Sequence, residues 1–369
     1  MEKKVLLITM GGTIAGNVAV TNKEGEHIKK ENEFSLILAD AVASIKGTSG
    51  IVVTIDHSPL CNIDSSDILP KEWIALANKI REEYDNFDAF LVTHGTNTMG
   101  YTAAALSFSL ANLDKPVIIT GSQVPAGMPG SDAVMNLENA LRVAVINRKD
   151  KEQIKGVMAV FGSHIITGTR VKKSTEFDYD AFKSFQDSSI GRIGRIIQID
   201  DNNLKKHIGY LSTNSYRPAQ KAEDLYCENE FDMRIASLTE FPGMDITIFE
   251  TLVRQNKIKG FILRAFGAGD AATRLIPALE YLKREGIPIV ITTQAPDGNS
   301  NFQVNEPGRE IAKNKLGIPA FDMSIESQTT KLAWLLAKKE KGEITYEQLC
   351  SKMTEDIRGE VNHIWEVKM

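Results

Sequence analysis

The feature that most constrains the fold is a repeated unit, in which a short apolar run leads into a glycine-containing turn and then a helical stretch. The apolar runs are continuous rather than alternating, as expected of strands buried on both faces of a parallel sheet. Strands that alternate with helices in this way predict an α/β fold. Four such runs lie in the first half of the chain: 5–10 before Gly11, 88–93 before His94, 117–120 before Gly121, and 157–161 before Gly162.

Helical segments separate these strands, and a second series of the same kind follows. In the first half we expect helices at 70–84, 100–113 and 132–146. In the second half we expect helices at 245–256, 273–285, 326–340 and after Tyr346, with strands at 260–263 and 287–293.

The length of 369 residues also suggests about two domains. We therefore predict a larger N-terminal parallel-sheet domain at 1–196 and a smaller C-terminal α/β domain at 231–369. Between them, the polar segment 197–230 is expected to be irregular and to serve as the linker.

Charge is distributed unevenly along the chain. The 43 residues from 89 to 131 carry only Asp114 and Lys115, where an even spread of the charged quarter would give about eleven. The stretch 89–113 is long enough for a membrane span. It contains too many threonines, serines and other polar groups for lipid, however, so we interpret it as core and expect no membrane association.

Bulk composition excludes several classes of function. The net charge is −5, from 43 basic and 48 acidic residues, so nucleic acid is not expected as a partner. The apolar run 5–8 is too short for a signal peptide. The cysteines, Cys61, Cys227 and Cys350, are odd in number and far apart, which favours neither a disulfide framework nor a CxxC metal site. A reducing cytoplasm fits this pattern.

The turn after the first strand resembles a nucleotide loop but fails both tests for one. Its glycines, Gly11, Gly12 and Gly16, do not have GxGxxG spacing, and residues 17–18 are not the Lys-Ser/Thr pair of a phosphate-binding loop. What remains is the hydroxyl of Thr13 on a glycine-flanked turn. Ligands of open parallel sheets bind beyond the carboxyl ends of the strands, where this turn lies.

Thr96 occupies the corresponding turn after the second strand, and both threonines have two interpretations. Each is either a helix cap or part of a nucleophile site, which also needs a base. His94 is close in sequence, but a single histidine at a strand end is more often a structural hydrogen-bonding group. Lys173 lies in the polar run 170–175, which alone indicates only surface charge, and a lysine acts as a base only where its surroundings lower its pKa.

These turns resemble the bacterial-type L-asparaginases, and the similarity covers nearly the whole chain. The motifs that carry it are 10–16, 63–67, 91–99, 115–123, 267–269, and 322–326 followed by 330–332. The last of these, together with a start that we expect to lack a leader, resembles the cytoplasmic type I enzymes. The resemblance implies two α/β domains, a homodimer or homotetramer, and hydrolysis of the side-chain amide of L-asparagine, or of a close derivative, without a cofactor.

The resemblance also assigns roles by position. It implies that Thr13 is the nucleophile that forms an acyl-enzyme and that Thr96 and Lys173 handle the proton. Backbone N–H groups near Gly12 and Thr96 would stabilise the oxyanion, at about 3–4 kcal/mol for each donor. Gly12 and Gly95 are also expected in the substrate-binding site. The residues implied to hold the substrate's α-carboxylate and amino group are Asp64, Ser65 and Ser66.

Three positions depart from the family pattern. Asn97 replaces an aspartate that, in the family, orients the lysine and contacts the substrate ammonium, and Asp270 stands where the family usually has asparagine. The lid tyrosine is missing, since the first tyrosine is Tyr84, and His27 is a possible replacement. If residues 97 and 270 face each other, Asp270 takes over the ammonium contact while Asn97 keeps the geometry.

The departures keep other functions open. An amidase of altered specificity and a catalytically weak amino-acid- or amide-binding regulatory protein are the alternatives, because lost contacts in a buried pocket change discrimination by orders of magnitude. A glutamyl-tRNA amidotransferase subunit ranks lower. We expect the chain to lack room for the extra N-terminal domain of that protein, and its composition shows no basic surface.

Overall fold

The structure is a computed structural model that describes residues 1–11, 31–211 and 225–362, with only the backbone described at 31–36. The chain forms two compact units, described here one at a time. The first contains Met1–Ser184 and Ser188–Asn229, and the second contains Phe185–Asp187 and the chain from Glu230 onward. Among the described residues, no helix is long and apolar enough to cross a membrane.

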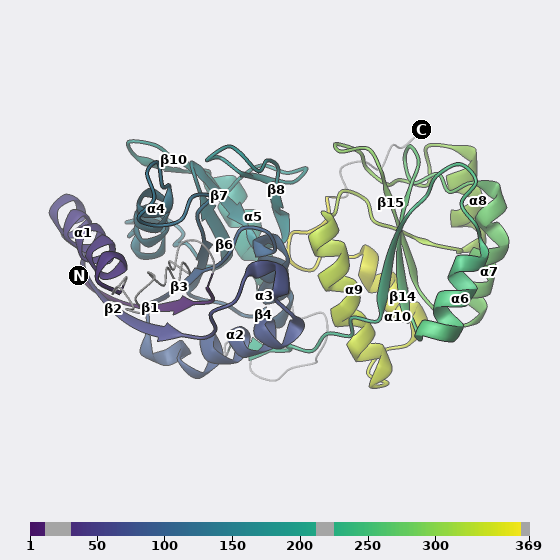
Figure 1. Cartoon of the computed structure of the whole chain (residues 1–369), viewed down its shortest axis with the longest axis horizontal. Helices are drawn as coiled ribbons and strands as arrows, with labels where there is room; N and C mark the ends of the chain where they lie inside the picture. The colour runs from purple at the N-terminus through teal and green to yellow at the C-terminus, as the bar shows by residue number, and fades with distance from the viewer. Residues whose placement is uncertain (12–30, 212–224, 363–369) are drawn as a thin grey trace, which may run out of the picture. The chain divides into compact units, whose positions relative to one another are not determined.

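The first unit is built on an eight-stranded sheet with the order β11-β10-β7-β6-β5-β3-β1-β2 (Figure 1). The five strands from β2 to β6 in this order are parallel, and the remaining pairs are antiparallel. The strands are β1 (Glu2–Thr9), β2 (Val52–Pro59), β3 (Ala89–Thr93), β5 (Pro116–Thr120), β6 (Gly156–Phe161), β7 (His164–Thr167), β10 (Gly191–Ile193) and β11 (Ile197–Ile199).

The predicted α/β class with a mostly parallel sheet is confirmed, but the turn after β6 differs from the others. Gly162 and Ser163 reverse the chain directly into β7, so the fourth predicted strand starts an antiparallel edge rather than another crossover. Gly162 has φ +54°, and a Cβ there would lie 2.0 Å from Oδ1 of Asp180. A two-residue turn of this kind needs positive φ, which explains the glycine.

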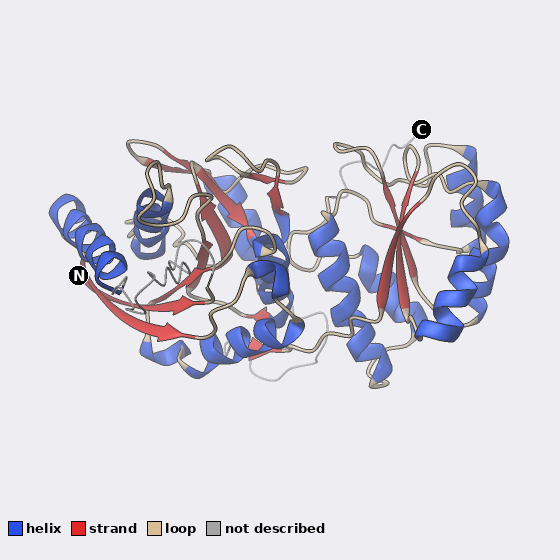
Figure 2. Ribbon diagram, in the orientation of Figure 1, coloured by secondary structure: helices blue, strands red, loops and turns tan. Residues whose placement is uncertain are grey.

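Helices cover both faces of this sheet (Figure 2). Successive strand residues point to opposite faces, so Leu91 packs in the cluster with α1 and α4, whereas Phe90 packs in the cluster with α2 and α3. Both faces are therefore buried, which explains the continuous apolar runs. The helices are α1 (Glu31–Ser49), α2 (Pro70–Glu82), α3 (Met99–Ser109) and α4 (Ala133–Val145).

The segment predicted to be irregular is partly regular. It begins with β11 and continues into α5 (Asp201–Leu211), both within the first unit. Asp200 explains the helix, because its Oδ1 accepts from the backbone N–H groups of Asn202 and Asn203 at 2.9 and 3.0 Å. This is N-terminal capping by an aspartate, and the polar Asp-Asp-Asn-Asn run is a helix start rather than a linker signal.

Two short antiparallel pairs complete the first unit. β4 (Leu110–Ala111) pairs with β12 (Tyr226–Cys227), and β8 (Val171–Lys173) pairs with β9 (Phe182–Ser184). The second pair carries Lys173, one of the predicted catalytic residues.

The second unit is a four-stranded parallel sheet with the order β13-β14-β15-β16 between two helical layers (Figure 1). Helices α6, α7 and α8 lie on one side of the sheet, and α9 and α10 lie on the other. The elements are β13 (Ile235–Thr239), α6 (Thr247–Asn256), β14 (Gly260–Ala265), α7 (Ile276–Arg284), β15 (Ile289–Thr293), α8 (Glu306–Asn314), β16 (Ile318–Pro319), α9 (Ile325–Glu340) and α10 (Tyr346–Thr354). The predicted helices and strands of this half are confirmed to within a few residues.

Candidate active site

The carboxyl ends of three neighbouring parallel strands meet at one edge of the larger sheet. β1 ends at Thr9, β3 at Thr93 and β5 at Thr120, and these residues are in register. The pairing continues one step beyond them, since Met10 N donates to Thr93 O at 3.1 Å and His94 N donates to Thr120 O at 2.9 Å. The turns predicted to carry the chemistry therefore start side by side.

The loop at 62–66 packs directly on two of these turns, and glycines make room for it. At Gly11, where φ is +93°, a Cβ would lie 2.6 Å from the backbone N and O of Ile63. At Gly95 a Cβ would lie 2.6 Å from Oγ of Ser65. Thr98 Oγ1 also donates to Ser65 O at 2.6 Å. The loop is thus fixed against the ends of β1 and β3.

Lys173 joins this edge from the β8–β9 hairpin. Its Nζ donates to Oγ1 of Thr96 at 3.0 Å and to Oδ1 of Asn97 at 3.2 Å, so three of the predicted catalytic residues are in contact. The same Nζ lies 2.6 Å from Oε2 of Glu176. Thr96 is not the helix cap, because the cap position of α3 is Thr98.

Asn97 also links Lys173 to the predicted substrate-binding loop. Its Nδ2 donates to Oγ of Ser66 at 3.0 Å. Hydrogen bonds from Ser66, chiefly from its backbone N–H at 2.7 Å, lower the pKa of the Asp64 carboxyl. Asp64 and Ser66 are exposed, whereas Ser65 is buried against Gly95. The side chains presented to solvent at this point are therefore a carboxylate, a hydroxyl and an amide.

His94 is buried in a closed hydrogen-bond chain and is not arranged as a base. Nε1 of Trp73 donates to Oγ1 of Thr102 at 3.0 Å, Thr102 contacts His94 Nε2 at 2.8 Å, and His94 Nδ1 contacts Gly95 O at 2.7 Å. A carbonyl only accepts, so Nδ1 carries the proton and Nε2 accepts from Thr102. Burial lowers the pKa of His94 to about 4. The imidazole is neutral, as the structural interpretation requires.

Four predicted site residues do not belong to the contacts described above. Gly12, Thr13 and His27 lie outside the described residues. Asp270 belongs to the second unit, where its Oδ2 accepts from Nδ2 of Asn305 at 2.5 Å. The expectation that Asp270 compensates for Asn97 concerns both units and stays a prediction.

Sequence reasoning missed Glu176. The polar run that contains Lys173 was interpreted as 170–175, one residue short of it. A glutamate three residues after a candidate lysine would have been the available signal, but in a loop that spacing alone does not bring the side chains together. Within the described ranges, no group of three or more His, Cys, Asp or Glu side chains could hold a metal ion.

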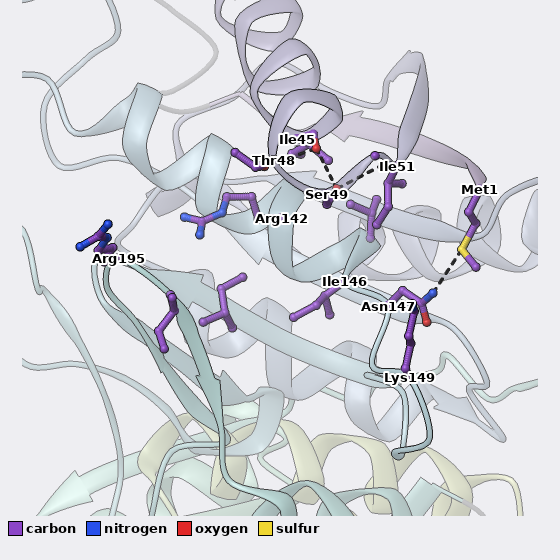
Figure 3. A pocket seen from close by; sticks show the side chains of 14 residues that line it. Met1, Ile45, Thr48, Ser49, Ile51, Arg142, Ile146, Asn147, Lys149 and Arg195 are labelled. Carbon is purple, nitrogen blue, oxygen red and sulfur yellow. Dashed lines mark hydrogen bonds between the residues drawn. The ribbon is translucent and has the colours of Figure 1, made fainter.

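A separate cavity of about 590 Å³ lies at the opposite, amino-terminal edge of the larger sheet (Figure 3). It is lined by the ends of α1 and α4 and by the residues that precede the first two strands, Met1 before β1 and Ile51 before β2. Its charged lining residues are Arg142, Lys149 and Arg195. Because the strands are parallel, this edge is remote from the turn that carries Thr96, and the cavity is not part of the candidate site.

Two family descriptions match the chain. Residues 4–205 match "Asparaginase, N-terminal", and residues 234–347 match "Glutaminase/Asparaginase C-terminal domain". L-asparaginase 1 of Escherichia coli K12 is 34% identical over 364 residues, covering 98% of this chain and 99% of that protein. The glutamyl-tRNA(Gln) amidotransferase subunit of Methanococcus maripaludis C7 is 30% identical over 372 residues, covering 98% of this chain and 81% of that protein.

Solved structures agree with the sequence comparison. The thermostable L-asparaginase from Thermococcus kodakarensis has a TM-score of 0.79 at 28% identity, covering 97% of this chain and 99% of that one. L-asparaginase I from Vibrio cholerae has a TM-score of 0.75 at 29% identity, covering 98% and 100%. With both halves of the sequence matched and the fold shared over nearly the whole chain, this chain belongs to the asparaginase family of amidohydrolases, which act on linear amides.

Proposed function

We propose that this protein hydrolyses the side-chain amide of L-asparagine, or of a close derivative, to a carboxylate and ammonia. The observation that carries the proposal is the 3.0 Å contact between Lys173 Nζ and Thr96 Oγ1. Thr96 follows β3, and the neighbouring strand β1 ends four residues before Thr13 in the sequence. A hydroxyl paired with an amine is an arrangement that moves a proton. A nucleophilic threonine needs such a partner.

The proposed reaction runs through a covalent intermediate. The Thr13 hydroxyl attacks the amide carbon and gives its proton to Thr96, which passes its own proton to Lys173 in the amine form. The proton returns to the leaving nitrogen as the C–N bond breaks, which releases ammonia and leaves an acyl-Thr13 ester. Water then hydrolyses the ester by the same route in reverse, and backbone N–H groups near Gly12, Gly95 and Thr96 stabilise the oxyanion.

Substrate recognition in this proposal uses the polar groups that surround Asn97. Ser66 donates to the α-carboxylate of the substrate, and the Asp64 carboxylate pairs with its ammonium group. An exposed aspartate is ionised at neutral pH, and hydrogen bonds from Ser66, which lower the pKa of Asp64, further favour the charged form. Ser65 holds the loop in place. A homodimer or homotetramer in the cytoplasm, with no cofactor, belongs to the same proposal.

One observation favours a second candidate. A relative named as a glutamyl-tRNA(Gln) amidotransferase subunit is 30% identical across 98% of this chain. The chain would then act as part of an amidotransferase and would release ammonia at a useful rate only in the presence of its partner.

Ammonia release from the purified chain tests the proposal. L-asparagine, L-glutamine and a panel of related amides are incubated with the wild type, with Thr13→Ala and with Thr48→Ala, a control at the opposite edge of the sheet. We expect wild type and control to release ammonia and Thr13→Ala to release none. Tight binding of an amide without turnover would favour the regulatory alternative, and activity retained by Thr13→Ala would refute the proposed nucleophile.

A further inference from the structure

The ammonium group of Lys173 has three described acceptors, and only one of them carries a charge. A lysine ammonium has three hydrogens to donate. They meet Thr96 Oγ1 at 3.0 Å, Asn97 Oδ1 at 3.2 Å and Glu176 Oε2 at 2.6 Å. Two of these groups are neutral, so Glu176 is the anion of the set and makes the shortest contact.

We propose that Glu176 is the positioning carboxylate of Lys173, supplying the negative charge that Asn97 does not supply. This inference rests on the function proposed above, because Glu176 acts through Lys173 and not on the substrate. It assigns a role to a residue outside the motifs that the sequence offered.

Asn97 makes two hydrogen bonds that need an amide, so the negative charge beside Lys173 comes from another residue. Its Oδ1 accepts from Lys173, while its Nδ2 donates to Ser66 Oγ at 3.0 Å. A carboxylate has no hydrogen to donate and could make only the first of these contacts in the same way. Position 97 thus joins the lysine to the 64–66 loop, and Glu176 balances the lysine's charge.

The loop that carries Glu176 is fixed at three points. At its base, Ser174 N donates to Ala181 O at 2.8 Å. In the middle, Gln123 Nε2 donates to Glu176 O at 2.9 Å. Near its tip, Tyr179 Oη donates to Gly130 O at 2.6 Å. A glutamate on a tethered backbone loses less conformational freedom when it pairs with Lys173 than one on a free loop would.

A fully exposed ion pair usually contributes little to protein stability. The pair between Lys173 and Glu176 differs because the lysine side chain is mostly buried. The Lys173 side chain is only 13% exposed, although that of Glu176 is 66% exposed. Two further acceptors hold the ammonium from the other side, so the charge stays in one place. The Lys173 end of the pair is therefore held in a network of four side chains, although Glu176 itself stays largely exposed.

The arrangement has a chemical consequence for proton transfer. In the amine form that the proposed function requires, Nζ has two hydrogens for Asn97 and Glu176 and accepts from the hydroxyl of Thr96. When the amine takes the proton of Thr96, a positive charge develops at Nζ beside the Glu176 carboxylate. A carboxylate that orients a base and stabilises the cation formed on it plays the part of the aspartate in a Ser-His-Asp triad. Removing the charge therefore lowers kcat, and leaves KM little changed because Glu176 does not bind the substrate.

Moving the carboxylate tests this role more sharply than removing it. We expect Glu176→Gln to lower kcat for the best amide substrate by about tenfold or more. Adding Asn97→Asp to that variant places a carboxylate 3.2 Å from the same Nζ and should restore most of the loss. Glu83→Gln, which breaks the Lys79 pair at 2.8 Å outside the site, is the matched control and should behave as wild type.

Two outcomes would overturn the inference: Glu176→Gln with wild-type kcat, or a loss that Asn97→Asp does not repair. A readout independent of turnover separates this failure from that of the proposed function. Mass spectrometry measures how fast a small amine-reactive reagent modifies Lys173, with Lys79 as internal reference. Glu176→Gln should raise the Lys173 rate several-fold, since the ammonium loses its counter-charge. An unchanged rate refutes the pairing even in a protein that releases no ammonia.

Discussion

Each unit contains a lysine that is held by a glutamate and two further acceptors, and those further acceptors differ in kind between the units. In the second unit, Lys331 Nζ lies 2.5 Å from Glu360 Oε1, and both side chains are 0% exposed. The same Nζ donates to the backbone carbonyls of Met353 at 3.1 Å and Glu355 at 2.5 Å. All three acceptors are fixed, and the carbonyls have no proton to exchange.

In the first unit, Lys173 has a hydroxyl and an amide in place of the two carbonyls. Thr96 can give its proton to the lysine and take one from a substrate-bound group, which a carbonyl cannot do. The Lys173 side chain is 13% exposed, whereas that of Lys331 is fully buried. An ion pair alone therefore does not make a lysine a catalytic candidate; the chemistry of its other two acceptors is what distinguishes Lys173 from Lys331.

The largest expected effect follows from removing the catalytic candidate. Lys173→Met should lower kcat by about 10²–10⁴-fold, the range for loss of a general acid or base. The free energy of unfolding should change little, because the side chain is partly exposed and its acceptors can reach water. Ammonia release and urea unfolding measure the two quantities.

Lys172→Met is the matched control, since it lies one residue earlier on β8 and its side chain points to the opposite side of the strand. We expect its kcat to equal that of the wild type. Equal losses in the two variants would mean that the hairpin, rather than the Lys173 ammonium, supports activity.

The buried pair should show the reverse pattern. Lys331→Met leaves the Glu360 carboxylate without its counter-charge in a buried site, and should lower the free energy of unfolding by about 3–5 kcal/mol. Urea unfolding followed by tryptophan fluorescence checks this, with Trp334 on the same helix as a reporter. Lys331→Met combined with Glu360→Gln should recover much of the loss, because the carboxylate left without its counter-charge is then replaced by a neutral amide. A double variant as unstable as the single one would contradict this explanation.

The sequence predicts elements that depend on local patterns better than contacts between residues far apart in the chain. Continuous apolar runs predict β3 and β5 because a strand buried on both faces leaves that pattern locally. The family motif identifies Thr96 and Lys173, which are 77 residues apart, only by resemblance. No local pattern marks Lys331 and Glu360 as a buried pair, since a lysine within a charged helix is normally exposed.

Local signals can also be misread when one pattern has two physical meanings. The run that begins at Asp200 is polar, and polarity predicts a linker, but the side chain of Asp200 caps α5. Likewise, the glycine at 162 marks a hairpin rather than a crossover, a distinction that depends on pairing between β6 and β7. Glu176 was missed because loop geometry, not spacing, brings it to Lys173.

His94 extends the comparison, because it is a base held entirely by internal partners. Thr102→Val keeps the side-chain shape but removes the hydrogen bond to His94 Nε2, and should lower the free energy of unfolding by about 1–3 kcal/mol. Since His94 is neutral and enclosed, kcat at neutral pH should hardly change. Ammonia release and urea unfolding measure the two quantities. A loss of kcat much larger than the loss of stability would mean that His94 takes part in the reaction.

The smallest expected effect is a pH dependence of the free energy of unfolding that comes from the buried pair of Lys331 and Glu360. Burial by itself raises the pKa of the Glu360 carboxyl, but the charge of Lys331 and the hydrogen bonds from Lys331, Arg358 and Ile357 outweigh it, so the net shift is downward. The unfolded carboxyl therefore binds a proton at a higher pH than the folded one.

Glu360 therefore contributes its full share to the free energy of unfolding above the ordinary glutamate pKa of about 4.3. That contribution is lost as the pH falls through the lower pKa of the folded state. Its size is about 1.4 kcal/mol for each pH unit between the folded and unfolded pKa. Urea unfolding between pH 3 and pH 7 measures this as the difference between wild type and the Lys331→Met/Glu360→Gln double variant. Exposed carboxylates titrate alike in both proteins and cancel. The difference in the free energy of unfolding between the two proteins should narrow as the pH falls. A constant difference would mean that the two side chains are neutral in the folded protein and are held by packing. The contrast between Lys173 and Lys331 would then rest on their exposure alone.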